Sequence, residues 1–165
     1  MKKYSYILVI AIAFFSCQKE KQVDKTTTLP FFNTATFTPE WIGEESARYN
    51  EIHTIPEFSF VNQNGEDVTQ KTYEGKIYVA DFFFVSCPGI CPRLTKNMTT
   101  LQEEYQNDGG ILLLSHTVMP WRDSVSELKK YAIENKINAN KWNLVTGDKD
   151  EIYNLARTAY FADED

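Results

Sequence analysis

The sequence lacks the features of nucleic-acid-binding, repetitive and disordered proteins. It has no dense basic patch, and 17 lysine and arginine residues stand against 23 aspartate and glutamate residues. This balance argues against a nucleic-acid partner. Internal repeats and low-complexity tracts are absent, and the hydrophobic (42 %) and aromatic (14 %) contents lie above the disordered range. The 165 residues are therefore expected to form one globular core.

Apolar runs long enough to cross a bilayer comfortably are also lacking. The run at residues 4–15 follows two lysines and has the length of a signal-peptide core. The next residues, Ser16-Cys17, resemble a bacterial lipobox, in which the cysteine becomes the acylated first residue. We predict a lipoprotein signal peptide over residues 1–16 and lipidation of Cys17, with an uncleaved anchor or a plain secretory signal as alternatives. The folded part would lie outside the cytoplasm, and the lipid would hold it to a cell-envelope membrane on the periplasmic side.

Cysteine and histidine are scarce, with three and two residues. If Cys17 carries lipid, Cys87 and Cys91 are the remaining thiols, in a compartment where disulfides persist. These two thiols are each other's expected partners. A zinc site takes four ligands, so two thiols and two histidines suit zinc poorly.

Beyond the signal, the pattern indicates a short tether and one domain. Residues 17–28 are polar without apolar periodicity, which is typical of a tether, and residues 29–165 form the domain. Residues 29–41 are aromatic but irregular, and we expect an extended arm. Alternating residues around Asn64-Gly65 predict a β-hairpin.

Strands and helices alternate after the hairpin. The expected elements are a buried central strand at 76–85, a helix from Pro92 to about Gly109, a strand at 111–118, a helix with Asp123 as N-cap, a short strand at 142–147 and a helix at 148–161. This rhythm predicts an α/β fold with a largely parallel sheet.

The stretch "DFFFVSCPGICPRL" carries the clearest chemical signal. Cys87 and Cys91 are four residues apart, so on a helix they would share a face. Pro92 suits the first turn of a helix, which places Cys91 at or beside the N-cap. Both thiols then lie at the positive end of the helix dipole, which lowers a thiol pKa.

Three roles fit such a thiol pair. A disulfide here would close only a five-residue loop and would stabilise the fold weakly, which disfavours a purely structural bridge. A thiolate is both the form that attacks disulfides and the form that binds soft metals such as copper(I). Redox and metal roles therefore both remain open from the residues alone.

Four other side chains could have either a structural or a functional role. His116 lies in the strand at 111–118 among leucines, and a hydrogen-bonded core histidine is the favoured interpretation over a metal ligand. His53 is expected on the surface or arm. Asp81, inside an apolar strand, could tune proton transfer of the thiols or be a satisfied structural group. Met98 falls on the core face of its helix, so packing is favoured over copper binding.

Four stretches together resemble the Sco/SenC family of thioredoxin-like copper proteins, in the form common among lipid-anchored bacterial members. They are "LPFFNTATFTPEW", "IPEFSFVNQNG", "DFFFVSCPGICPRLTKNM" and "LLLSHTVMPWRDSVSELKKYA". The resemblance implies a thioredoxin-like fold with a mostly parallel central sheet flanked by helices, and it implies that Cys87 and Cys91 are copper-binding and redox-active. The family's third ligand is a histidine in a later hairpin, which would fall beyond Asp165. The resemblance therefore implies a chain truncated at its C-terminus, without the last strands and helix. The family often has an aspartate in place of Met119.

Two functions follow as hypotheses. The resemblance implies a copper chaperone, rather than an enzyme, that delivers copper to the copper subunit of a respiratory cytochrome c oxidase or to another copper acceptor. The alternative is a thiol-disulfide oxidoreductase that reduces partner cysteines without metal transfer.

Overall fold

The computed structural model of the protein describes residues 28–162. The predicted signal peptide, the predicted lipidation site Cys17 and nearly all of the predicted tether lie outside these residues. The described chain divides into two compact units, residues 28–33 with 38–52, and residues 34–37 with 53–162. None of the described helices is both long and apolar enough to pass through a membrane.

The smaller unit is a short ribbon followed by one helical turn. Strands β1 (Phe31–Phe32) and β2 (Pro39–Glu40) pair antiparallel, and the 3₁₀ helix η1 (Ala47–Glu51) follows. Ser46 caps η1 by accepting a hydrogen bond from the Arg48 amide. The Arg48 guanidinium also forms an ion pair with Glu40, which links η1 to β2. The aromatic segment expected as an extended arm thus contains a small antiparallel pair.

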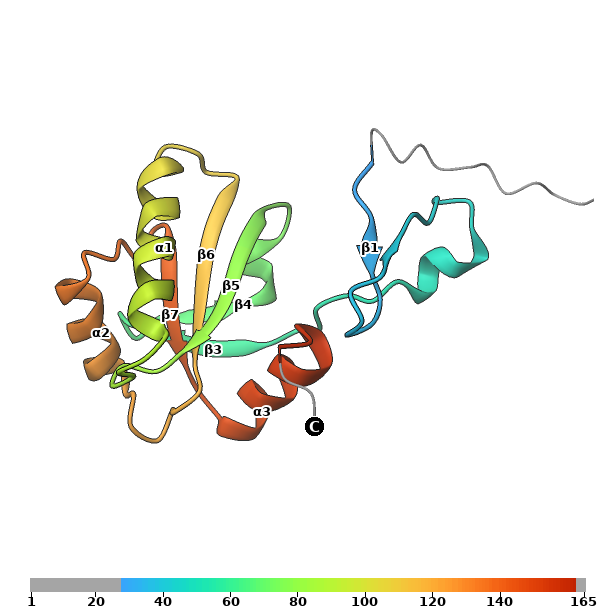
Figure 1. The fold of residues 1–165 in the computed structure, drawn as a ribbon. Helices are drawn as coiled ribbons and strands as arrows, with labels where there is room; N and C mark the ends of the chain where they lie inside the picture. Colours follow the sequence, from blue (N-terminus) through green and yellow to red (C-terminus); the bar gives the residue numbers. More distant parts are fainter. Residues whose placement is uncertain (1–27, 163–165) are drawn as a thin grey trace, which may run out of the picture. The chain divides into compact units, whose positions relative to one another are not determined.

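The larger unit contains a five-stranded sheet (Figure 1). Its strand order is β4-β3-β7-β6-β5, with bounds β3 (Ser59–Asn62), β4 (Asp67–Thr69), β5 (Ile77–Phe83), β6 (Ile111–Thr117) and β7 (Trp142–Thr146). Strands β5, β6 and β7 run parallel, whereas β3 is antiparallel to both β4 and β7. The hairpin predicted at Asn64-Gly65 joins β3 to β4, and Gly65 takes the positive φ of 82° that the turn needs.

Helices cover both faces of this sheet (Figure 1). Helices α1 (Cys91–Glu104) and α2 (Val125–Glu134) pack on one face, where Met98, Leu128 and Trp142 belong to one buried cluster. The other face packs against α3 (Lys149–Asn154), the π-helical turn η3 (Leu155–Ala159) and the 3₁₀ helix η2 (Gln70–Tyr73). The predicted α/β fold is confirmed, and its sheet is mixed because the hairpin adds two antiparallel pairings.

Alternation along β6 decides which side chains can approach the thiols. Leu113 belongs to the cluster under α1 and α2, whereas Leu114 belongs to the cluster under α3. Because successive side chains of a strand point to opposite faces, Ser115 lies on the face of Leu113, and His116 lies on the face of Leu114. All of these residues are buried.

The expectation of a buried central strand at 76–85 is wrong in one respect. Within the described residues β5 pairs only with β6 and forms the edge of the sheet. Ile77 and Val79 are 67 % and 38 % exposed, so the first half of β5 leaves one row of apolar side chains uncovered. The second half is covered, and Phe83 is buried. A continuous apolar run therefore identified the strand but not its place in the sheet.

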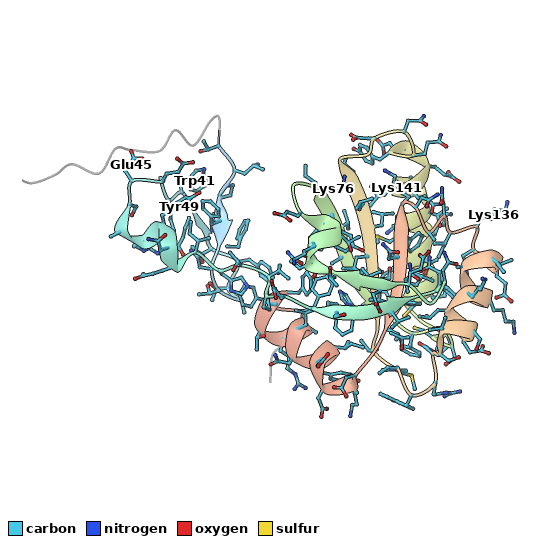
Figure 2. All side chains as sticks on the ribbon, turned by 180° about the vertical axis from the view of Figure 1, so that it is seen from behind. Trp41, Glu45, Tyr49, Lys76, Lys136 and Lys141 are labelled. Atoms are coloured by element: carbon cyan, nitrogen blue, oxygen red, sulfur yellow. The ribbon has the colours of Figure 1, made fainter. Side chains whose placement is uncertain are left out.

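Two lysines form hydrogen bonds with backbone carbonyls at the end of the sheet opposite the cysteines. Figure 2 shows Lys76 and Lys141 at this end, where β5 and β6 begin. The Lys76 ammonium donates to the Gly109 carbonyl (2.8 Å), and the Lys141 ammonium donates to the Ile111 carbonyl (2.7 Å). These bonds fix the loop from α1 to β6. The carboxyl ends of the strands, at the opposite end, carry the cysteine loop.

Candidate functional site

The candidate site lies in the loop between β5 and α1. The chain leaves β5 after Phe83, makes a turn in which the Cys87 amide donates to the Phe84 carbonyl (3.2 Å), and enters α1 at Cys91. The N-cap is Ile90, with Pro92 in the first turn, as its fixed φ favours. The prediction that Cys91 lies beside the N-cap is confirmed.

The two cysteines are free thiols in unequal surroundings. Cys87 is half-buried, whereas Cys91 is only 5 % exposed. The pKa of Cys87 is lowered by a hydrogen bond from the Cys91 side chain and by the backbone N–H groups of Cys91, Gly89 and Ile90. The pKa of Cys91 is raised by burial and by the same bond to Cys87. A hydrogen bond from the Phe84 N–H partly opposes this rise.

This asymmetry gives the two sulfurs different chemistry. Cys87 is the sulfur that ionises first, because a helix N-terminus and neighbouring amides stabilise a negative charge. Cys91 supplies the hydrogen bond and keeps its proton longer. The thiolate character predicted for both thiols is therefore concentrated on Cys87, and burial of Cys91, which the sequence did not reveal, is the reason.

A chain of three hydrogen-bonded polar side chains lies on the face of the sheet that carries the thiols; Ser115 and Trp142 are buried and Asp81 is half-buried. Asp81 of β5 is paired with Ser115 of β6, whose hydroxyl donates to the Asp81 carboxylate. The Trp142 indole N–H donates to the Ser115 hydroxyl oxygen (2.8 Å). Burial raises the pKa of Asp81, and the bond from Ser115 opposes this rise only in part. Asp81 is therefore a hydrogen-bonded internal group, consistent with the structural role weighed from the sequence.

Tyr131 of α2 lies close enough to Asp81 and to both thiols for their charges to act on it. The Thr95 hydroxyl donates to the Cys91 carbonyl (2.9 Å), so its single proton is used and the Tyr131 hydroxyl, 2.7 Å away, must donate to it. Burial raises the pKa of Tyr131, and the charges of Cys91, Asp81 and Cys87 raise it further. The sequence did not identify Tyr131 as a site residue, because a tyrosine on an amphipathic helix looks like any other core residue.

Asp123 is a second site residue with a role that the sequence did not predict. It was expected as the N-cap of α2, but Ser124 holds that position and accepts from the Glu127 amide (3.4 Å). Asp123 is 3 % exposed, and its carboxylate accepts from the Val85 amide (3.1 Å) and from the Thr117 hydroxyl. The correction has a simple cause: two adjacent residues could both cap, and only tertiary packing turned the aspartate inward.

The histidines lie away from the thiols. His116 is fully buried on the opposite face of the sheet, among the rings of Phe58, Phe60 and Phe82, and neither ring nitrogen has a hydrogen-bond partner. Burial lowers its pKa to about 3. The core position is confirmed, but the expected hydrogen bond is not formed. His53 is half-buried and bonds the Ala159 carbonyl (2.9 Å).

Met98, which was weighed as a copper ligand, and Met119, which stands where the family often has an aspartate, have separate roles. Met98 is 4 % exposed in the cluster under α1, so the packing role is confirmed. Met119 follows β6, and its amide donates to the Thr117 hydroxyl (3.0 Å). Within residues 28–162 no group of three or more His, Cys, Asp or Glu side chains could hold a metal ion. The thiol pair thus offers two ligands.

The strand order, the flanking helices and a thiol pair at a helix start define a thioredoxin-like α/β protein. The sequence model of the SCO1/SenC family matches residues 46–164. The chain belongs to the SCO1/SenC family.

Three solved structures illustrate the similarity. BsSco, described as a member of the Sco family of cytochrome c oxidase assembly proteins with a disulfide switch, is 31 % identical, with a TM-score of 0.61 over 67 % of this chain and 65 % of that one. A SCO1/SenC family lipoprotein from Bacillus anthracis is 30 % identical, with a TM-score of 0.62 over 66 % of each chain. Arabidopsis thaliana ScoI with copper bound is 31 % identical, with a TM-score of 0.52 over 64 % of this chain and 66 % of that one. The chain spans 58 % of the length of the SCO1 protein homolog of Bacillus subtilis.

Proposed function

We propose that the protein binds copper through the sulfurs of Cys87 and Cys91 and delivers it to a copper centre of cytochrome c oxidase. The observation that carries this proposal is the hydrogen-bonded sulfur pair at the start of α1, in which backbone amides favour the Cys87 thiolate. Soft thiolates suit copper(I). A relative at 31 % identity has been crystallised with copper bound, and another is described as an oxidase assembly protein.

The described residues account for part of a copper site. Cys87 offers an accessible thiolate, and Cys91 offers a buried sulfur that loses its proton when the metal binds. His116 cannot join them without refolding, since it lies on the other face of the sheet. A further ligand would come from outside residues 28–162, as the family resemblance implies for a downstream histidine, or from the acceptor protein during transfer.

The location of the protein is part of the same proposal. Cys17 would carry lipid after removal of residues 1–16, and residues 17–28 would tether the domain on the periplasmic side of a membrane. A family member from Bacillus anthracis is described as a lipoprotein, which supports this reading. The partner would be the copper subunit of an oxidase or another copper acceptor at that membrane.

Copper titration of the reduced protein tests the proposal. We expect one copper ion per chain by elemental analysis, and loss of binding in Cys87→Ser, in Cys91→Ser and in the double variant. His116→Phe is the matched control, because it removes an imidazole but keeps an aromatic ring in the core. Copper retained by the double Cys variant, or lost in His116→Phe with its fold intact, would overturn the assignment.

A second function, thiol-disulfide exchange, is favoured by the asymmetry of the two sulfurs. The Cys87 thiolate would attack a partner disulfide, forming a mixed disulfide and releasing the partner's other sulfur as a thiolate. Cys91 would then lose its proton and attack the Cys87 sulfur. The products are a Cys87–Cys91 disulfide and a reduced partner dithiol, so two electrons pass to the partner.

The two functions separate in one comparison. If exchange is the function, the copper-free reduced protein reduces a disulfide substrate, and Cys91→Ser accumulates the mixed disulfide on Cys87. If the copper role alone holds, Cys91→Ser accumulates no adduct under the conditions in which the wild-type protein binds copper. Mass spectrometry of the non-reduced protein distinguishes these results.

A further inference from the structure

We propose that Asp123 is a positioning residue for the thiol pair: it holds the peptide group that in turn holds Cys87. Asp123 belongs to the loop between β6 and α2, 32 positions after Cys91 in the numbering, and no thiol motif includes it. The inference goes beyond the proposed function, and rests on it only in taking Cys87 and Cys91 as the functional pair.

One peptide group joins Asp123 to Cys87, and the N–H of the preceding peptide group reaches Cys91. The N–H of the Phe84–Val85 peptide donates to the Asp123 carboxylate (3.1 Å). The carbonyl of the same peptide accepts from the Cys87 amide (3.2 Å). The preceding N–H, that of Phe84, bonds the Cys91 sulfur. A shift of the Phe84–Val85 peptide group would therefore move the hydrogen bond at Cys87 directly, and it would move the bond at Cys91 through Phe84, the residue that the two peptide groups share.

Asp123 is itself fixed from three sides. Its carboxylate oxygen accepts from the Thr117 hydroxyl as well as from Val85, and its own amide donates to the Met119 carbonyl (2.9 Å). The Thr117 hydroxyl oxygen accepts from the Met119 amide (3.0 Å). A buried carboxylate is tolerated only when hydrogen-bonded, so these bonds hold the side chain in one place.

Asp123 links the cysteine loop to the loop between β6 and α2. The last bond between β5 and β6 at this end runs from the Val118 amide to the Phe83 carbonyl (2.8 Å). Beyond it, the bond from the Val85 amide to the Asp123 carboxylate joins the cysteine loop to the loop after β6. Backbone that lacks such a bond opens more readily than backbone that has one. Asp123 thus keeps Cys91 covered and Cys87 within its group of amides.

Alkylation of each cysteine in the reduced full chain tests this role without copper. Iodoacetamide labelling at fixed pH, followed by peptide mass spectrometry, gives a separate rate for Cys87 and Cys91. In Asp123→Ala we expect the Cys91 rate to rise about tenfold, because the loop that buries it opens. Hydrogen exchange of the Val85 and Cys87 amides should accelerate in the same variant.

Two further variants separate position from charge and from general stability. In Asp123→Asn the amide oxygen can accept both hydrogen bonds, so the Cys91 rate should stay within about twofold of wild type. Asp148→Ala is the control for general stability: the Asp148 carboxylate likewise accepts two hydrogen bonds, here from the Asp150 and Glu151 amides, but it is exposed at the start of α3. Its Cys91 rate should also stay within about twofold.

Three results would overturn the proposal. One is an unchanged Cys91 rate in folded Asp123→Ala, and another is an equal rise in Asp148→Ala, which would indicate general destabilisation. The third is a rise in Asp123→Asn as large as in Asp123→Ala, which would indicate charge. If Asp123→Ala fails to fold, Thr117→Val takes its place, because it removes the hydroxyl that donates to Asp123. We then expect a smaller rise in the Cys91 alkylation rate, and Thr117→Ser, which keeps the hydroxyl, must show no such rise.

Discussion

The chain of Trp142, Ser115 and Asp81 under the thiols predicts a defined energetic coupling. Ser115 is 1 % exposed; its hydroxyl donates to Asp81 and accepts from the Trp142 indole. Ser115→Ala removes both bonds and leaves the buried Trp142 indole N–H and the half-buried Asp81 carboxylate without this partner. A bond between neutral groups contributes about 0.5–1.5 kcal/mol and one to a charged group about 1.5–3 kcal/mol, so we expect a loss of about 2–4 kcal/mol in unfolding free energy.

Trp142→Phe removes the indole donor and part of a ring that is 1 % exposed. We expect about 1 kcal/mol for the hydrogen bond and about 1–2 kcal/mol for the lost packing. The double variant should be less destabilised than the sum of the single variants by about 1 kcal/mol, since both remove the same bond. Additive costs would show that the bond contributes nothing.

Guanidinium unfolding at neutral pH measures these differences from the shift of the midpoint at constant slope. Ser126→Ala is the matched serine control, because Ser126 is exposed on α2 and its hydroxyl hydrogen-bonds the side chain of Ser124, which is also exposed. Its cost should stay within about 0.5 kcal/mol. A larger loss in this control than in Ser115→Ala would contradict the role assigned to burial.

Three shorter predictions follow from other contacts. Cys91→Ala removes the donor that lowers the pKa of Cys87, so alkylation of Cys87 at mildly acidic pH should slow; an unchanged pH profile would contradict this. His116 has a folded pKa of about 3, below its unfolded value, so its contribution to stability is present above about pH 6.5 and is lost as the pH falls; unfolding midpoints of His116→Phe should fall less steeply between pH 6.5 and 4. Gly147→Ala would place a Cβ 2.6 Å from the buried Phe60 ring and should cost about 1–3 kcal/mol in thermal or chemical unfolding, whereas no loss would mean that the ring can move.

Local sequence signals predicted much of the fold. The Asn64-Gly65 turn and the apolar strand at 111–118 appear close to their expected bounds, and the helix after the second cysteine begins where expected but ends at Glu104, five residues before Gly109. Each of these depends on nearby residues: a turn that needs positive φ, an apolar run, and a proline that begins a helix. The face of Met98 and the buried position of His116 follow from periodicity in the same way.

Long-range packing decided what the sequence could not show. The apolar run of β5 suggested a central strand, but pairing within the described residues puts it at the edge of the sheet. A capping aspartate and a buried one look alike in sequence, so the contact of Asp123 with Val85, 38 positions away, was invisible. The orphaned nitrogens of His116 likewise depend on which rings surround it.

The sequence by itself determined that two thiols stand at the start of a helix after a strand, because spacing and proline act over a few residues. Only the tertiary structure decided that Cys87 and Cys91 are unequal, since burial and hydrogen bonding depend on packing from several elements. It also decided that Asp81, Tyr131 and Asp123 share the face of the sheet with the thiols, while His116 lies on the other. The physical reason is that alternation along a strand fixes relative faces, but only assembly of the sheet sets which face the cysteine loop covers.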